Sequence, residues 1–299
     1  MAAPETLAAR VGPIVDANVH LWDQRDNPVF WLSDRTLVRD MLGNYDALPD
    51  TYALGEYLDA TAGFDVRGVW SDAGAADPVA AAGWVCDQSP AGVIQAIVSL
   101  AAPADAGFEQ QVRTLAENSL LRSIRIRLVP GLAAGGAGSR DALAQALRLL
   151  GELELVPTIE AGAEQLGQVE QLLRASAEAP AVVDHFGWPA DLTERGRRVH
   201  MGVLERIAEL PHVSTRIDAM TTIFGAGWQV ERVRPWLQGV VDVFGAERCM
   251  LGSDMPIETL SRSFAELYDA YDTIFADGSD DERSLLFGGT AARVYGAGR

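Results

Sequence analysis

The stretch LVPTIEAGAEQLGQVEQLLRASAEAPAVVDHF (155–186) contains one complete copy of a pattern that repeats along the chain. An apolar run at 155–160 is followed by a polar turn, by apolar residues at helical spacing over 163–177, and by a second apolar run at 181–186. This order is typical of a strand, a crossover helix and a neighbouring parallel strand. We therefore predict a βαβ unit here.

The same alternation extends in both directions through the 299 residues, and no linker divides them. We predict eight strands, at 13–18, 66–71, 93–99, 123–128, 155–160, 181–186, 212–218 and 249–254. We predict helices at 76–88, 107–121, 139–151, 163–177, 199–210, 229–245, 261–276 and 280–295. This pattern indicates an α/β fold, a single-domain (β/α)8 TIM barrel over 13–299 after a flexible N-terminal tail at 1–12. An open doubly wound sheet is the alternative.

The charged residues are 24 basic side chains, all of them arginine, and 42 acidic ones, which give a net charge of -18. The absence of lysine excludes Schiff-base chemistry, a phosphate-loop NTPase and a carbamylated lysine between two metals. The acidic balance argues against nucleic acid or an anionic membrane as a partner. No apolar run is long enough to span a membrane, and two cysteines are too few for a disulfide framework. We expect a cytoplasmic protein that acts on a small molecule. The sequence leaves open whether the protein forms a homo-oligomer.

Polar side chains stand at the C-terminal ends of the predicted strands, where a barrel carries its active site. Asn18 and His20 end the first strand on one face, because strand side chains alternate with a period of two. The other strand ends carry Arg125, Arg127, Glu160, Asp184, His185, Arg216, Asp218 and Asp254. We expect these groups to meet at one mouth, although each alone also suits a structural hydrogen bond or ion pair.

Several other features carry less chemistry. His200 and His212 are predicted at the opposite rim, as surface residues, and neither Cys86 nor Cys249 has the placement of a nucleophile. There is no GxSxG motif, which disfavours a serine acyl-enzyme. The glycine-rich segment 129–139 is predicted to be a lid or a linker, and the aromatic-rich segment 23–54 is predicted to shape a pocket over the mouth.

Three phrases resemble a known family. IVDANVHLWD (14–23), VVDHFGWP (182–189) and MLGSDMPI (250–257) are similar to the signatures of the amidohydrolase-related (amidohydrolase 2) TIM-barrel hydrolases. Within that family the resemblance is to the branch of L-fuconolactonase-like and 2-pyrone-4,6-dicarboxylate lactonase-like enzymes, whose signatures read close to DxHxHLWD, DHxGxP and GSDWP. The match in order and spacing covers about residues 14–295.

The resemblance implies a hydrolase in which Asp254 is the general base on water, while His185 and His20 orient the water or polarise a carbonyl. Asn18 stands where relatives have the first histidine of the pair. An amide oxygen is a weaker zinc ligand than imidazole. We therefore expect either no cofactor or one weakly held divalent metal such as zinc, with His20, His185 and Asp254 as its candidate ligands.

The arginines suggest the charge of the substrate. Guanidinium groups bind carboxylates with two hydrogen bonds and can stabilise an oxyanion. The predicted substrate-binding residues are Arg125, Arg127, Arg216, Asn18 and Trp22. The sequence thus predicts a hydrolase of a small, carboxylate-bearing lactone or similar cyclic ester or amide. Two alternatives stay open: a lyase (decarboxylase, dehydratase or cyclase) on the same scaffold, and a degenerate barrel that binds a small anion without turnover.

Overall fold

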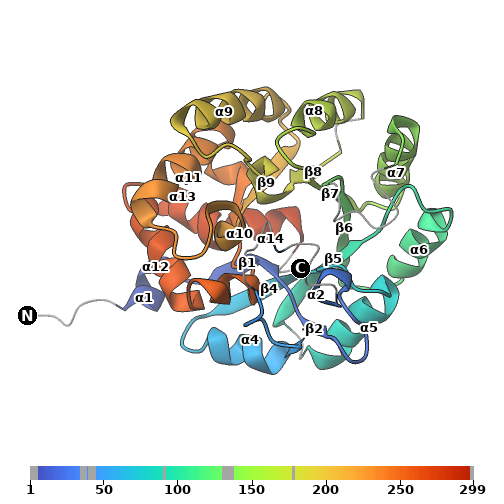
Figure 1. Cartoon of the computed structure of the whole chain (residues 1–299), viewed down its shortest axis with the longest axis horizontal. Helices are drawn as coiled ribbons and strands as arrows, with labels where there is room; N and C mark the ends of the chain where they lie inside the picture. The colour runs from blue at the N-terminus through green and yellow to red at the C-terminus, as the bar shows by residue number, and fades with distance from the viewer. Residues whose placement is uncertain are drawn as a thin grey trace, which may run out of the picture.

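The structure is a computed structural model that describes residues 6–33, Arg39, 45–89, 92–129, 138–176 and 179–296. Its centre is a sheet of eight parallel strands that curves into a barrel (Figure 1). In their order around the sheet the strands are β1 (Ile14–Val19), β4 (Val66–Ser71), β5 (Ile94–Leu100), β6 (Leu121–Arg127), β7 (Val156–Glu160), β8 (Ala181–Val183), β9 (Val213–Ile217) and β10 (Cys249–Leu251). All eight predicted strands, and the single-domain barrel, are confirmed.

The barrel closes along a seam between its first and last strands. β10 ends at Leu251, but the chain continues beside β1, where the Asp254 amide donates to the Asn18 carbonyl (2.8 Å). The His20 amide donates in turn to the Met255 carbonyl (2.8 Å). Gly252 permits this approach, because a Cβ at that position would lie 2.9 Å from Cβ of Asn18. The seam therefore brings the end of the last strand against the end of the first.

A ring of helices surrounds the barrel (Figure 1). It contains α5 (Pro78–Gln88), α6 (Phe108–Leu115), α7 (Arg140–Glu152), α8 (Leu166–Ala175), α9 (Glu194–Ala208), α11 (Val230–Phe244) and α12 (Phe264–Ile274). Ser139 caps α7 by accepting from the Ala142 amide, as expected for this residue type. The helix predicted at 280–295 is interrupted: α13 (Asp280–Ser284) and α14 (Thr290–Val294) flank a π-helical turn, η4 (Leu285–Gly289).

Short elements complete the fold. They are α1 (Leu7–Val11), β2 (Trp22–Asp23), α2 (Phe30–Ser33), β3 (Thr51–Tyr52), α4 (Leu54–Ala60), η1 (Asp184–Gly187), α10 (Met220–Phe224), η2 (Ala246–Arg248) and η3 (Ile257–Leu260). Part of the N-terminal segment expected to be a tail thus forms α1, and Arg10 attaches it to Asp272 of α12 (2.9 Å). Within the described residues, no helix has both the length and the apolar character that a membrane crossing needs.

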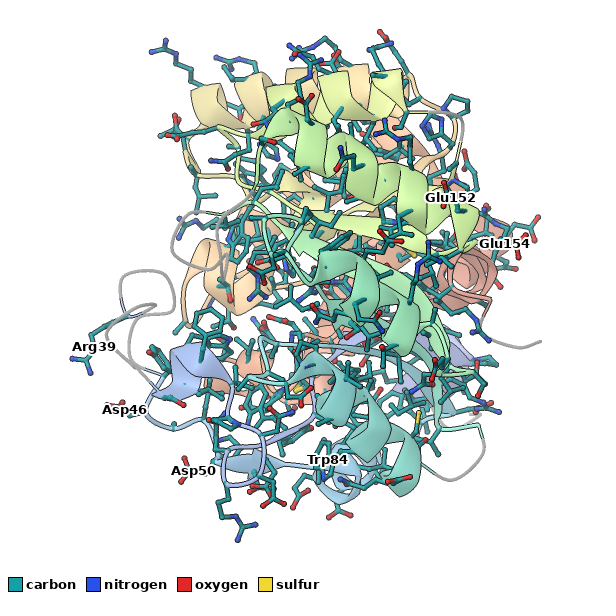
Figure 2. All side chains as sticks on the ribbon, turned by 90° about the vertical axis from the view of Figure 1, so that its right-hand side faces the viewer. Arg39, Asp46, Asp50, Trp84, Glu152 and Glu154 are labelled. Carbon is teal, nitrogen blue, oxygen red and sulfur yellow. The ribbon has the colours of Figure 1, made fainter. Side chains whose placement is uncertain are left out.

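The segment after β1 lies at the mouth of the barrel. In Figure 2, Arg39 and Asp46 of this segment lie on the side opposite Glu152 and Glu154, which precede β7. Here Trp31 packs edge-on against both Trp22 (5.9 Å) and Tyr45 (6.0 Å). The glycine-rich segment 129–139 falls mostly outside the described residues, which end at 129 and resume at 138.

The barrel interior has two layers. Small strand residues form an apolar cluster with two residues of the C-terminal region, Ala291 and Tyr295. Above it, toward the mouth, the same inward-facing strand positions carry charged side chains, among them Arg125, Asp184 and Arg216, all of them buried. The charged layer therefore lies between an apolar floor and the mouth.

Candidate active site

Three side chains from the seam meet at the mouth. Oδ1 of Asp254 accepts a hydrogen bond from Nδ2 of Asn18 (3.1 Å) and lies 3.1 Å from Nε2 of His20. All three residues are buried, and Asp254 is only 2% exposed. The structure thus brings together Asn18, His20 and Asp254, as the sequence predicts.

The neighbours of His20 determine where its protons lie. Nδ1 is 2.6 Å from the Ser71 carbonyl oxygen, which can only accept, so Nδ1 carries a proton. If the ring were neutral, Nε2 would then be an acceptor facing the Asp254 carboxylate at 3.1 Å. The contact therefore requires one further proton between His20 and Asp254.

Asp16 holds the turn that carries Asp254. Its Oδ1 accepts from the Ser253 amide (2.7 Å), and its Oδ2 accepts from the Ser253 hydroxyl (2.6 Å) and from the Tyr57 hydroxyl (3.0 Å). Asp254 itself adopts a left-handed conformation with φ 56°. Burial raises the pKa of Asp16 to about 6, although these donors lower it. Asp16 was not among the predicted site residues, and its place in the first signature is the signal that could have found it.

His185 lies in the turn η1, directly after the sixth barrel strand. Its Nδ1 lies 2.6 Å from Oδ1 of Asp218. Burial opposes the charged imidazole, but Asp218, Asp184 and Glu160 together raise the pKa of His185 above its ordinary value of 6.5. Burial likewise opposes ionisation of Asp218, yet His185 and Arg216 hold its pKa well below the usual range. The imidazolium form of His185 is therefore favoured in the folded protein.

The three predicted arginines are paired to internal carboxylates. Nε of Arg125 lies 2.9 Å from Oδ2 of Asp184, and Nε of Arg216 lies 2.6 Å from Oδ1 of the same residue. Nε of Arg127 donates to Oε2 of Glu160 at 2.7 Å. Burial would raise the pKa of Glu160, but Arg127 and Arg125 lower it to about 2. Arg125 and Arg216 are at most 1% exposed, whereas Arg127 is 8% exposed.

Comparison with known proteins shows the family of the chain. The family model described as "Amidohydrolase" matches residues 15–297. The chain belongs to this amidohydrolase family. An uncharacterized protein of Sinorhizobium fredii is 28% identical to it, over 94% of this chain and 98% of that protein. An L-fucono-1,5-lactonase of Burkholderia multivorans is 33% identical, over 38% of this chain and 42% of that enzyme.

Solved structures of the family share the fold. A zinc-bound amidohydrolase from Burkholderia multivorans has a TM-score of 0.78 and 22% identity, and the match covers 95% of this chain and 99% of that one. A putative 2-pyrone-4,6-dicarboxylic acid hydrolase from Pseudomonas putida has a TM-score of 0.70 and 18% identity, with 96% and 98% covered. These two structural matches show that the chain has the same fold as those proteins.

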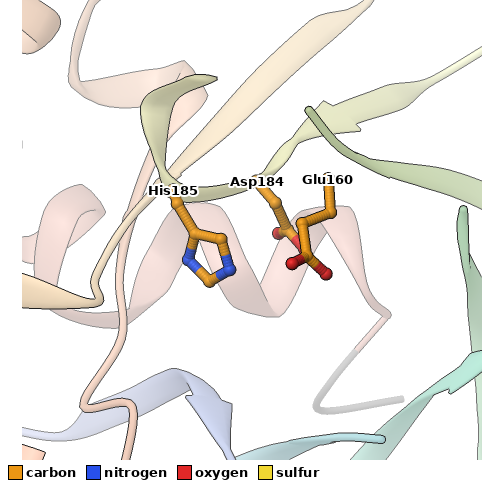
Figure 3. A group of neighbouring side chains, drawn as sticks. All are labelled: Glu160, Asp184 and His185. Carbon is orange, nitrogen blue, oxygen red and sulfur yellow. The ribbon is translucent and has the colours of Figure 1, made fainter. Parts of the chain in front are cut away.

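Two carboxylates and one imidazole form a compact group of potential metal ligands in this amidohydrolase. Glu160, Asp184 and His185 offer ligand atoms within 4.8 Å of one another. Figure 3 shows these three side chains. Both oxygens of Asp184 and one of Glu160 already face guanidinium nitrogens of Arg125, Arg216 and Arg127. A divalent cation there would have to displace these cations. The group therefore does not fit a metal.

The predicted ligand set does not fit a metal either. His20, His185 and Asp254 do not form such a compact group in the part of the chain that the structure describes. The third group beside His20 and Asp254 is the Asn18 amide, which directs its NH₂ toward the carboxylate. Catalytic zinc sites have three protein ligands, usually including imidazoles. The donors at this seam therefore do not match a zinc site.

Two cavities lie near the mouth. One of about 370 Å³ is lined by Arg127 together with the ends of β5 and the start of α5, including Leu100, Ala102 and Pro78. Trp22 lines a different cavity, of about 130 Å³, which is largely apolar. Trp22 is buried, and its Nε1 donates to the Pro49 carbonyl (3.0 Å). Of the predicted substrate-binding residues, Arg127 therefore has the clearest access to a cavity.

The prediction that His200 lies at the surface is wrong. His200 is 5% exposed, and its Nε2 lies 2.8 Å from the Phe186 carbonyl oxygen. The error arises because α9 begins at Glu194 rather than at 199, since Thr193 caps it by accepting from the Gly196 amide. The earlier start places His200 in the second turn of α9, on the side that packs against the barrel.

Proposed function

We propose that the chain hydrolyses a small, carboxylate-bearing lactone or a similar cyclic ester or amide, with Asp254 as the general base on water. The observation that carries this proposal is the arrangement of Asp254. Asn18 and His20 both contact its Oδ1, and no residue in the described ranges donates to its Oδ2. Oδ2 is thus the oxygen that can take a proton from water.

His185 supports the proposal as the partner that stabilises charge. Attack on a lactone carbonyl produces an oxyanion, which a positively charged donor stabilises. Asp218 occupies Nδ1 of His185, so Nε2 is the nitrogen that can donate to the substrate. His20 contributes a second imidazole, whose Nε2 lies 3.1 Å from Oδ1 of Asp254 and orients the carboxylate. In this proposal His185 stabilises the oxyanion, whereas His20 acts on Asp254.

The position of Arg127 is the reason to propose a carboxylate on the substrate. It lines the larger cavity beside the mouth, and Glu160 holds its Nε. Arg125 and Arg216 lie deeper, against Asp184, and we assign them to the positioning of the charged layer. In this proposal a substrate carboxylate binds in the cavity that Arg127 lines, while the reacting carbonyl lies toward Asp254 and His185.

The proposal is tested with pairs of lactones that differ only in a carboxylate, incubated in oxygen-18 water. We expect ring opening with one labelled oxygen in the new carboxyl group, and faster turnover of the charged member. Arg127→Gln should raise KM for the charged member only. Turnover without the label would indicate a lyase instead, and absence of turnover across the panel would reject the lactonase assignment.

The pH dependence should report the charge on His185. Because the pKa of His185 is raised above 6.5, the imidazolium persists above that pH, and kcat/KM should fall as pH rises through the raised value. Removing the Asp218 carboxylate lowers this pKa, so Asp218→Asn should move the alkaline limb to lower pH by about one unit or more. An alkaline limb at the same pH in both proteins would contradict this role of His185.

Metal removal should leave the activity unchanged. The donors around Asp254 do not match a zinc site, and three guanidinium groups compete for the buried carboxylates. We expect the same kcat before and after exhaustive chelation, and only weak binding of added zinc by calorimetry. Loss of activity on chelation, restored by one equivalent of zinc, would overturn this expectation.

A further inference from the structure

His185 lies in a backbone turn that a protein must actively hold in place. Four consecutive residues have positive φ: His185 (50°), Phe186 (40°), Gly187 (79°) and Trp188 (45°). For residues other than glycine this left-handed conformation costs roughly 1–2 kcal/mol each. Surrounding contacts therefore have to fix the turn, and with it the direction of the His185 side chain.

The main polar contact to the middle of this turn comes from α9. The Phe186 carbonyl oxygen, which can only accept, lies 2.8 Å from Nε2 of His200, so Nε2 carries the proton and donates. Burial lowers the pKa of His200, which keeps the ring neutral. The centroid of the His200 ring lies 6.5 Å from that of Phe186 and 5.9 Å from that of Trp236. The donor is thus held in one orientation by aromatic neighbours.

The other side of the turn is fixed by packing. A Cβ on Gly187 would lie 2.6 Å from Cδ1 of Leu166 in α8, so the backbone here is in close contact with that helix. The Trp188 amide donates to the His185 carbonyl (3.0 Å), and the two rings lie 4.9 Å apart. The turn is therefore clamped between α8 and the imidazole of His200.

We propose that His200 is a positioning residue for His185. His200 holds the backbone of the residue that follows His185, while Asp218 holds the His185 side chain at Nδ1. Without the His200 donor, the Phe186 carbonyl loses this partner, and the left-handed turn can relax toward a less costly conformation. The imidazole of His185 would then lose its alignment with Asp218 and with the mouth.

This role rests on the proposed function only in that His185 is taken to contact the substrate. The hydrogen bond from His200 fixes the position of His185 whatever the reaction is. A readout that needs no substrate therefore separates the two proposals.

The test uses three variants of His200 with matched chemistry. His200→Gln places an amide NH₂ near the position of Nε2, whereas His200→Asn carries the same amide on a side chain that is one methylene shorter. His200→Phe keeps the ring against Phe186 and Trp236 but removes the donor. We expect His200→Asn and His200→Phe to lower kcat by about 10- to 100-fold with little change in KM, and His200→Gln to recover most of the loss.

The readout without substrate is the proton on Nδ1 of His185. Its short contact with Asp218, at 2.6 Å, should give a downfield resonance in histidine-labelled protein, and only four histidines need assignment. We expect this resonance to persist in His200→Gln and to shift or disappear in the other two variants. Equal spectra and equal kcat in all the folded variants would overturn the proposal, as would losses that follow the melting temperature alone. If no lactone is turned over, the spectra still decide the role of His200.

Discussion

Replacing Asp254 with asparagine is expected to lower kcat by about 10²- to 10⁴-fold, the range typical of a lost general base. The amide has the size of the carboxylate, and its oxygen can take the place of Oδ1 as the acceptor for Nδ2 of Asn18, so this contact of the seam should survive. It cannot accept a proton from water, so the chemical step slows while KM changes little. Steady-state kinetics on the lactone that the panel identifies measure the effect.

The control for this variant is Asp269→Asn, which removes the same charge from an exposed ion pair with Arg10. Its kcat should equal that of the parent protein. If Asp254→Asn also kept the parental kcat while folding normally, Asp254 would not be the base, and His185 would be the next candidate for that role.

Replacing Asp184 with asparagine should produce the largest loss of stability. Asp184 is the shared partner of Arg125 and Arg216, and all three side chains are at most 2% exposed. Removing one member of a buried ion-pair group typically costs about 3–5 kcal/mol, because charge is left buried without compensation. We expect a decrease of that size in the free energy of unfolding, measured by urea denaturation.

The matched control is again Asp269→Asn, since that side chain is 59% exposed and pairs with a half-exposed arginine. Surface ion pairs contribute about 0–1 kcal/mol, so this variant should unfold close to the parent midpoint. Similar losses in the two variants would mean that the charged layer is not a stabilising network.

The fold is largely readable from the sequence, because each barrel strand is a short apolar run bounded by turns. The prediction at 181–186 shows the limit: β8 ends at Val183, and the next residues enter the left-handed turn that carries His185. No local pattern indicates such a turn, because it is held by contacts with α8 and α9. Tertiary contacts, not propensity, set the backbone there.

The sequence predicts that Asn18, His20 and Asp254 meet, as they do, but it does not indicate how the charged side chains of the interior pair. Alternation along the strand puts Arg125 and Arg127 on one face, and in the structure Nε of each approaches Oε2 of Glu160, at 3.8 and 2.7 Å. Glu160 lies on the neighbouring strand β7, whereas Asp184 directly follows β8, the next strand but one, so register across the barrel decides which side chains pair. As a result of this register, Arg125 pairs with the buried carboxylate of Asp184 and does not line the cavity beside Arg127.

The seam between the first and last strands also bears on the order of assembly during folding. The Asn18 side chain and the Asp254 carboxylate that it contacts are separated by 236 residues of sequence. The charged layer formed at the ends of β6, β7, β8 and β9 can assemble from more local segments. Asp254, the proposed base, reaches Asn18 and His20 only when the last strand docks against the first. Catalytic competence would thus appear late in folding, after most of the barrel has formed.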